Sequence, residues 1–284
     1  MTRMSLPLLR RLALLLVLLL AAPLPAQAAF WDDYRSATLT YTPEAWPAKL
    51  EGDLYVPRDK KRAPYPVVVL VHGGAWNKGD KKTMARAGRA LAGKGYAAFA
   101  VNYRLVPQFR YPAQLEDMQQ ALRWLQQNAE TYRLDMNRVA LWGYSAGGHL
   151  AALAGVQPIT TDLPTVRAVI AGGTPADLRD SDAPSVRAFL GGSKTEQAAA
   201  YREASPIAHV HAGLPAFFLY HGTADELVEP AQSERFAAAL KEEGVPVELI
   251  RLEGEDHRRA ASAVKHYLPN LMGFLEKYLG PAAR

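Results

Sequence analysis

A run of six apolar residues, 66–71, constrains the fold of this chain more than any other feature. A strand with one buried face alternates apolar and polar residues, whereas a continuous apolar run is typical of a strand covered on both faces. Strand-like and helix-like segments alternate after this run. The sequence therefore predicts an α/β fold in which helices cover both faces of a mostly parallel sheet.

The expected elements follow this alternation along the chain. Strands are expected at 37–42, 50–56, 66–71, 97–102, 138–142, 166–171, 216–220 and 247–252. Helices are expected at 81–94, 112–130, 146–156, 230–243 and 260–279. The first two strands, rich in Thr, Tyr and Val, are expected to form an antiparallel pair.

The segment 174–213 interrupts this alternation. It is rich in Asp, Ser, Pro and Ala and contains no clear strand. Long irregular segments within compact domains are often functional lids. We expect a small lid-like insertion here, with an ordinary helical excursion as the alternative.

Residues 1–28 have the features of a secretory signal peptide. Three arginines accompany an apolar run at 12–22, and residues 26–28, Ala-Gln-Ala, fit the A-x-A cleavage pattern. The run is shorter than the roughly 20 apolar residues that span a membrane. We therefore expect cleavage, no stable membrane insertion, and an exported domain at 29–284 that is periplasmic or extracellular.

Charge and cysteine content exclude several classes of function. Without the three arginines of residues 1–28, the formal net charge falls from +5 to +2, and no basic stripe indicates a nucleic-acid partner. The chain has no cysteine, which excludes disulfides and thiolate metal sites. Both features are consistent with an exported enzyme that acts on a small molecule.

Residues 143–147, Gly-Tyr-Ser-Ala-Gly, match the pattern G-x-S-x-G. They lie between the expected strand 138–142 and the expected helix 146–156, which is the context of a nucleophile elbow. The serine occupies a tight, strained turn, so the residues two before and two after it must be small. The turn also places the hydroxyl at a helix N-terminus, where an anion is favoured. We therefore expect Ser145 to be a nucleophile.

Residues 72–76, His-Gly-Gly-Ala-Trp, directly follow the apolar strand 66–71. A glycine-rich loop at this point brings backbone N–H groups close to a substrate carbonyl, where they can stabilise a tetrahedral oxyanion. The expected donors are the N–H groups of Gly74, Ala75 and Ala146. We expect His72 to orient this loop by hydrogen bonding.

The order of catalytic residues selects among seven histidines. Nucleophile-elbow enzymes have the order Ser, acid, His, which favours a histidine after the last strand. His257 follows the expected strand 247–252 and is the expected base. The other six are expected to pack or to lie at the surface: His72, His149, His209, His211, His221 and His266. Substrate contact is the alternative for His209 and His211. Among these, His221 is expected to brace the loop that carries the acid.

The catalytic acid is expected in the loop after strand 216–220. Asp225 lies there, and its carboxylate would accept the imidazole N–H and stabilise the imidazolium. Glu226 is the nearest alternative and Glu229 a weaker one. Asp256 adjoins the expected base in sequence, but neighbouring loop residues rarely point at one another.

Together these motifs resemble the bacterial esterase and lipase branch of the α/β hydrolases, which includes hormone-sensitive-lipase-like and feruloyl-esterase-like carboxylesterases. The resemblance rests on residues 72–76, 143–147, 221–225 and His257, and extends from about residue 50 to the C-terminus. It implies an α/β-hydrolase fold with a mostly parallel eight-stranded sheet, an acyl-enzyme mechanism, and no metal or organic cofactor. Many relatives have a third glycine at Ala75, but the backbone N–H survives that change.

Three further residues are assigned from their positions beside these motifs. Trp76 and Tyr144 flank the expected pocket, and we interpret both as substrate-binding residues. Arg104 follows the strand 97–102, and we expect it to pair with Asp117 rather than to bind substrate.

The function that these features favour is hydrolysis of short-chain carboxylic esters. Segment 174–213 is too polar for a lipid-facing lid, and Ala75 and Trp76 add bulk beside the oxyanion site. The alternative is an amide hydrolase of the same fold, either arylformamidase-like or a serine exopeptidase. No amine-binding carboxylate pair is evident in the sequence, and the family's peptidases usually carry a propeller domain before the first strand. A binder without activity is disfavoured because all three triad candidates are present.

Overall fold

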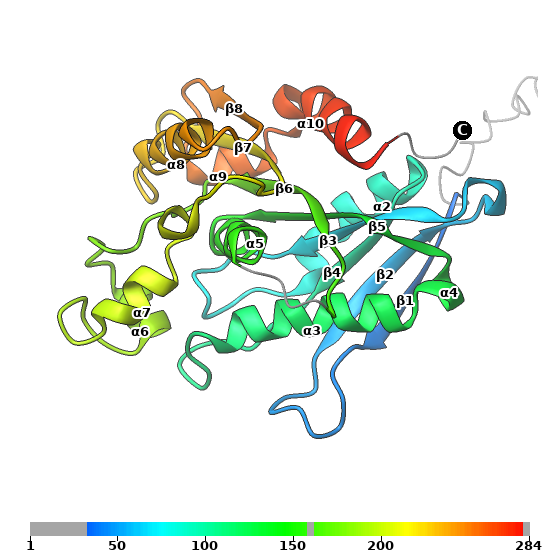
Figure 1. Cartoon of the computed structure of the whole chain (residues 1–284), viewed down its shortest axis with the longest axis horizontal. Coiled ribbons are helices and arrows are strands. Elements are labelled where there is room, and N and C mark those ends of the chain that lie inside the picture. The colour runs from blue at the N-terminus through cyan, green and yellow to red at the C-terminus, as the bar shows by residue number, and fades with distance from the viewer. Residues whose placement is uncertain (1–32, 158–161, 281–284) are drawn as a thin grey trace, which may run out of the picture. The chain divides into compact units, whose positions relative to one another are not determined.

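The computed structural model describes residues 33–157 and 162–280, which form an eight-stranded sheet with helices on both faces (Figure 1). The expected signal peptide, residues 1–28, lies outside the described residues. No helix in the described part of the chain is long and apolar enough to cross a membrane.

The sheet has the strand order β1-β2-β4-β3-β5-β6-β7-β8. The pairs β1/β2 and β2/β4 are antiparallel, and every other pair is parallel, as the sequence predicts. The strands are β1 (Tyr34–Thr40), β2 (Glu51–Pro57), β3 (Tyr65–Val71), β4 (Ala97–Val101), β5 (Leu134–Tyr144), β6 (Val166–Gly172), β7 (Ala216–Gly222) and β8 (Val247–Leu252). β1 begins three residues before the expected strand 37–42, because Tyr34 pairs with Pro57.

Nine α-helices and three 3-10 helices are described. The α-helices are α2 (Ala85–Gly93), α3 (Ala113–Gln127), α4 (Ala129–Tyr132), α5 (Ala146–Val156), α6 (Pro184–Leu190), α7 (Ala198–Glu203), α8 (Ala231–Glu242), α9 (His257–Ser262) and α10 (Val264–Leu279). The 3-10 helices are η1 (Lys60–Arg62), η2 (Lys81–Met84) and η3 (Pro206–His209).

Two expected helices differ from the structure at their beginnings. The expected helix 81–94 starts as η2, whose first turn is capped by the Asp80 side chain. The expected helix 260–279 divides into α9 and α10. α9 begins earlier, at His257, because the Asp256 carboxylate accepts hydrogen bonds from the next two backbone amides.

The apolar run that predicted a two-sided strand is fully buried in β3. Val67, Val69 and Val71 pack with residues of α3, α5 and α8 on one face of the sheet. Val68 and Leu70 pack with residues of α2, α9 and α10 on the other face. Burial on both faces explains why this strand contains no polar residue.

Arg104 has the structural role expected for it. Its guanidinium Nε lies 2.8 Å from Oδ1 of Asp117, whose side chain is fully buried. The indole of Trp46 donates a second hydrogen bond to the same carboxylate, also at 2.8 Å. The Asp117 carboxylate of α3 therefore binds the chain after β4 through Arg104 and the loop before β2 through Trp46.

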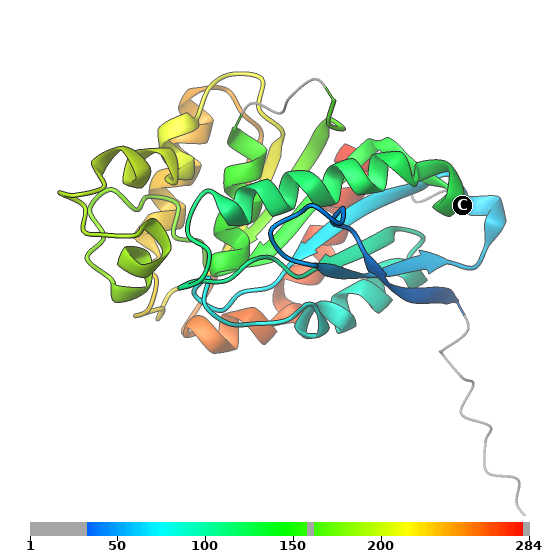
Figure 2. The same ribbon diagram turned by 90° about the horizontal axis from the view of Figure 1, so that it is seen from below.

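Segment 174–213 contains α6, α7 and η3 and no strand. Figures 1 and 2 both show α6 and α7 together on one side of the domain, with α4 on the opposite side. Its early residues line a pocket beside the carboxyl ends of the parallel strands.

Candidate active site

Ser145 lies at the turn between β5 and α5, with backbone angles φ 57° and ψ −125°. A residue with a side chain rarely adopts a positive φ, and such strain is concentrated at functional sites. A Cβ on Gly143 would clash with the backbone of Gly147, and one on Gly147 would clash with the backbone of β3. The turn therefore requires the two glycines that the motif supplies.

His257 is within hydrogen-bonding distance of both other candidate catalytic residues. Its Nε2 lies 2.9 Å from Oγ of Ser145, and its Nδ1 lies 2.6 Å from Oδ2 of Asp225. Ser145 follows β5, Asp225 follows β7 and His257 follows β8. Parallel strands end at the same edge of a sheet, so residues far apart in sequence meet there.

The Asp225 carboxylate is buried and accepts four hydrogen bonds. Oδ1 accepts the amides of Leu227, at 3.0 Å, and Val228, at 2.9 Å. Oδ2 accepts from His257 and from His221, the latter at 3.1 Å. Burial alone would raise the pKa of Asp225, but hydrogen bonds from His221, His257 and Val228 outweigh it and hold this pKa well below its ordinary value.

The other acids considered from the sequence lie elsewhere. Glu226 is exposed, and Asp256 caps α9 through two backbone amides. Glu229 lines the pocket but contacts neither His257 nor Ser145 among the described hydrogen bonds.

The loop after β3 has an unusual backbone. Gly74, Ala75 and Trp76 have successive positive φ angles of 121°, 51° and 59°. Amides at positions 77 and 78 donate to the Gly74 carbonyl, but no hydrogen bond within the described residues uses the amides of Gly74, Ala75 or Ala146. A Cβ on Gly73 would lie 3.5 Å from that of Ser145, so the loop lies against the nucleophile.

His72 contacts the beginning of this loop. Its Nδ1 lies 2.8 Å from the Gly73 carbonyl oxygen, and its ring stacks on Tyr103 with 4.3 Å between ring centroids. The Tyr103 hydroxyl donates to the His72 carbonyl at 3.0 Å. Burial lowers the pKa of His72, so the ring is kept neutral.

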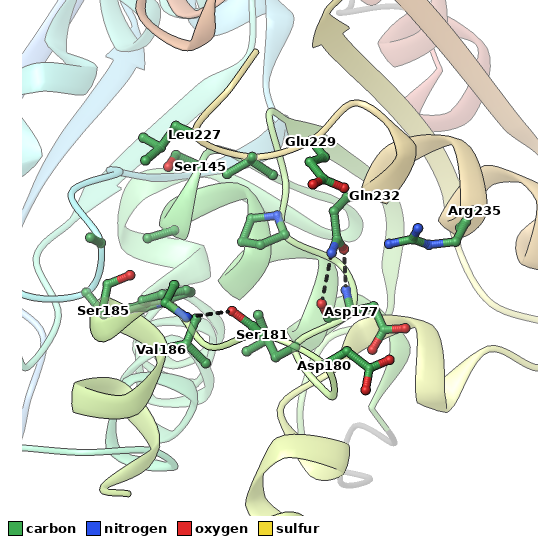
Figure 3. A pocket seen from close by; sticks show the side chains of 17 residues that line it. Ser145, Asp177, Asp180, Ser181, Ser185, Val186, Leu227, Glu229, Gln232 and Arg235 are labelled. Atoms are coloured by element: carbon green, nitrogen blue, oxygen red, sulfur yellow. Dashed lines mark hydrogen bonds between the residues drawn. The ribbon is translucent and has the colours of Figure 1, made fainter. Parts of the chain in front are cut away.

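A cavity of about 360 Å³ opens beside Ser145 (Figure 3). The nucleophile, the loop after β3, segment 174–213, the acid loop and α8 all contribute to its wall. Its polar side chains belong to Ser145, Asp177, Asp180, Ser181, Ser185, Glu229, Gln232 and Arg235. The Gln232 amide hydrogen-bonds the backbone N–H and C=O of Asp177, at 2.7 and 3.0 Å, and so ties α8 to segment 174–213.

The two expected substrate-binding residues have different positions. Trp76 lines the cavity, and its buried ring stacks on Phe189 with 4.5 Å between ring centroids. Tyr144 is not among the lining residues; its hydroxyl donates to the backbone carbonyl of His257 at 2.6 Å. The structure thus gives the Tyr144 hydroxyl a contact with the backbone of His257, and its expected contact with substrate stays a prediction.

Strand β6 lies between β5 and β7 and contributes no side chain to the triad. It ends in two glycines. A Cβ on Gly172 would clash with the ring of Tyr220, and one on Gly173, whose φ is 51°, would come within 2.7 Å of the Tyr144 ring. Because positions 172 and 173 carry no side chain, the rings of Tyr220 and Tyr144 fit beside them.

Sequence analysis missed several residues of the cavity wall, including Leu227, Gln232 and Arg235. Leu227 is 75% exposed and stands next to Ser145 in Figure 3. One signal in the sequence could have identified it, since it is an apolar residue two positions after the acid in a polar loop.

The sheet order, the two helical layers and the serine at a strained strand-to-helix turn define the class of this protein as an α/β hydrolase. The chain belongs to the BD-FAE family, whose model matches residues 52–240. Both the fold and the family resemblance expected from the sequence are thereby confirmed.

Curated relatives and solved structures agree with this assignment. The chain is 30% identical to Esterase LipC of Mycobacterium tuberculosis over 207 residues, which are 66% of this chain and 51% of LipC. It spans about half the length of the curated relatives it matches.

Two solved structures are similar over nearly their whole length. A truncated carbohydrate esterase from gut microbiota has a TM-score of 0.77 at 25% identity, covering 88% of this chain and 98% of that one. Esterase 2 of Thermogutta terrifontis has a TM-score of 0.76 at 26% identity, covering 88% and 94%. The latter has also been solved phosphonylated by sarin.

Proposed function

We propose that this protein hydrolyses short-chain carboxylic esters through an acyl-enzyme on Ser145, with His257 as base and Asp225 as the acid that orients it. The observation that carries the proposal is the unbroken chain of hydrogen bonds from Ser145 Oγ through His257 to Asp225 Oδ2. The relatives named as esterases support the same reaction class.

The geometry supports the following sequence of steps. His257 Nε2 accepts the hydroxyl proton as Ser145 Oγ attacks the ester carbonyl carbon, and Asp225 stabilises the resulting imidazolium. The carbonyl oxygen becomes an oxyanion. When the intermediate collapses, the C–O bond to the alcohol breaks and His257 returns the proton to the leaving oxygen. Water then attacks the acyl-enzyme by the same route and releases the acid.

The free amides of Gly74, Ala75 and Ala146 are the proposed oxyanion donors. Positive φ angles at Gly74 and Ala75 turn this loop against Ser145, and Ala146 begins α5. Preorganised donors of this kind contribute about 3 kcal/mol each to transition-state stabilisation.

The cavity wall supports a short acyl group and a hydrophilic alcohol. Trp76 lines the cavity and stacks on the Phe189 ring behind it, and we propose that this wall limits the depth available to an acyl chain. The outer wall presents carboxylate, amide, hydroxyl and guanidinium groups, which suit a hydroxyl-rich alcohol such as a sugar. The similarity to a carbohydrate esterase supports that choice. We propose that segment 174–213 forms a polar lid over this wall.

One observation favours a second candidate. The carboxylates of Asp180 and Glu229 both line the cavity, although no amine-binding carboxylate pair is evident from the sequence alone. An aminoacyl substrate would pair its ammonium group with a carboxylate of this wall. Aminoacyl anilides therefore belong in the same substrate panel as the esters.

The test combines a substrate panel with labelling of the nucleophile. We expect kcat/KM to be highest for p-nitrophenyl acetate or butyrate, lower for octanoate and lowest for palmitate and for anilides. Acetylated and feruloylated xylan are assayed beside them. Paraoxon should attach one diethyl phosphoryl group, and mass spectrometry should place it on the peptide that contains Ser145. A label on another residue, or a maximum at palmitate with interfacial activation, would overturn the proposal.

The location of the protein is a separate proposal. We propose export from the cytoplasm, supported by the leader-like pattern of residues 1–28. A reporter fused to these residues should be exported, and its retention in the cytoplasm would contradict the proposal.

A further inference from the structure

A second imidazole lies against the candidate catalytic acid. His221 is in β7, and its side chain is 2% exposed. Its Nε2 lies 3.1 Å from Oδ2 of Asp225 and 2.9 Å from the carbonyl oxygen of Val228. Its Nδ1 lies 2.7 Å from Oγ of Ser233, a buried residue of α8.

These contacts determine where the His221 proton lies. A carboxylate and a carbonyl oxygen can only accept, so the Nε2 atom between them must carry a hydrogen. The Ser233 hydroxyl can donate to Nδ1, and within the described residues this is its only hydrogen bond. Ser233 therefore holds the Nδ1 side of the ring, while the hydrogen on Nε2 faces Asp225.

His221 and His257 donate to the same oxygen of Asp225. The other oxygen is held by the amides of Leu227 and Val228, so about four lone-pair positions of the carboxylate are all in use. Rotation of the carboxylate away from His257 would also break the bond from His221. The second imidazole therefore restrains the acid in the orientation that the base needs.

We propose that His221, oriented by Ser233, is a positioning residue that holds Oδ2 of Asp225 toward His257. The inference rests on the proposed function, because His221 acts only through the Asp225–His257 pair. It extends the hydrogen-bonded chain from three side chains to five, from Ser145 in the elbow to Ser233 in α8.

The test compares two replacements of His221 that separate hydrogen bonding from packing. His221→Phe fills the buried space but removes the donor. His221→Gln packs less well but places an amide N–H near the former Nε2. A hydrogen bond to a charged group contributes about 1.5–3 kcal/mol, so kcat should fall roughly 10- to 100-fold in His221→Phe with KM little changed. His221→Gln should keep most of the wild-type kcat. A packing role predicts the opposite order, and that order would overturn the proposal.

The same substitution of His221 in the Asp225→Asn variant provides a second test. If His221 acts through the carboxylate, His221→Phe should reduce kcat by less than about twofold more once the carboxylate is gone. Independent, multiplicative losses would overturn the proposal. Ser233→Ala keeps His221 in place and should lower kcat by a smaller factor, which covers the case in which His221→Phe does not fold. If His221→Phe does not fold, wild-type kcat in Ser233→Ala refutes the proposal.

His209→Gln is the matched control. This half-buried histidine also has a ring nitrogen 2.8 Å from a carbonyl oxygen, that of Glu203, but it does not line the cavity. Its kcat should equal that of the wild type. Wild-type protein that neither cleaves esters nor takes up paraoxon would refute the proposed function, whereas active wild type with fully active His221→Phe refutes this inference alone.

Discussion

The hydroxyl of Tyr144 donates a hydrogen bond of 2.6 Å to the backbone carbonyl oxygen of His257. The residue before the proposed nucleophile thus holds the backbone of the proposed base. The two rings also lie in contact, with 5.1 Å between their centroids. Because Tyr144 ends β5 and His257 begins α9, this bond helps to set the distance between Ser145 and its base.

Tyr144→Phe should therefore reduce activity without abolishing it. The substitution removes only the hydroxyl, which burial keeps protonated by raising the Tyr144 pKa far above its usual value. A neutral hydrogen bond contributes about 1 kcal/mol, so we expect kcat to fall roughly fivefold. Steady-state kinetics on p-nitrophenyl acetate measures this. Tyr132→Phe, in α4, is the control and should behave as wild type; unchanged kcat in Tyr144→Phe would show that the bond has no role in positioning.

Replacement of Ser145 by alanine and by glycine should separate activity from backbone strain. Both variants lose the nucleophile, so kcat should fall by at least about 10⁴-fold. Alanine keeps the strained φ of 57°, whereas glycine relieves it. Ser145→Gly should therefore be more stable than Ser145→Ala by about 1 kcal/mol, as measured by urea unfolding. Ser262→Gly, at the helical end of α9, should not be stabilised, and equal stability of the two Ser145 variants would contradict the strain at this turn.

His149 should make the stability of the protein depend on pH. This histidine is fully buried in α5, and burial, only partly offset by a hydrogen bond to the Ala204 carbonyl, lowers its pKa from 6.5 to about 4. Between these values the unfolded chain binds a proton that the folded chain does not. The free energy of unfolding should therefore fall by about 1.4 kcal/mol for each pH unit below 6.5, and level off below pH 4.

The measurement is urea unfolding between pH 7 and pH 4 in wild type and His149→Leu. We expect the difference in stability between the two proteins to shift by about 3 kcal/mol in favour of the variant as the pH falls. His266→Gln, an exposed histidine in α10, should keep the wild-type slope. A His149→Leu slope identical to wild type would show that this residue titrates normally in the folded state.

Leu227 should contribute to the choice of acyl or alcohol group. It is exposed at the cavity mouth beside Ser145, so a bound apolar group can cover it. Each methylene that loses its contact forgoes up to about 0.8 kcal/mol. In Leu227→Ser, the ratio of kcat/KM for butyrate over acetate should fall roughly two- to fourfold. Glu226→Ser, in the same loop, should leave the ratio unchanged; a fall of the same size in both variants would argue against a specific role for Leu227.

Much of the fold was predictable because its signals are local or follow from chain order. The apolar run of β3 indicates burial on both faces without any knowledge of its neighbours. The glycines around Ser145 indicate a tight turn, and the order Ser, acid, His selects Asp225 and His257 from several acids and seven histidines. The structure brings these three side chains together.

The features that sequence analysis did not predict depend on contacts between distant segments. Tyr144 reaches a carbonyl 113 residues away, so its adjacency to Ser145 suggested a substrate contact instead. The helices α6 and α7 within 174–213 are short and carry weak periodicity. The start of α9 at His257 depends on a capping carboxylate, which moves a helix boundary by a few residues.

The two glycines that end β6 place a limit on how this pocket can be redesigned. Gly173 does not line the cavity, yet a methyl group on it would push the Tyr144 ring, and the Tyr144 hydroxyl holds His257. A methyl group on Gly172 would likewise push the ring of Tyr220. Directed evolution that widens or reshapes the cavity can therefore vary the wall formed by segment 174–213 and α8. Positions 172 and 173, by contrast, have to remain glycine.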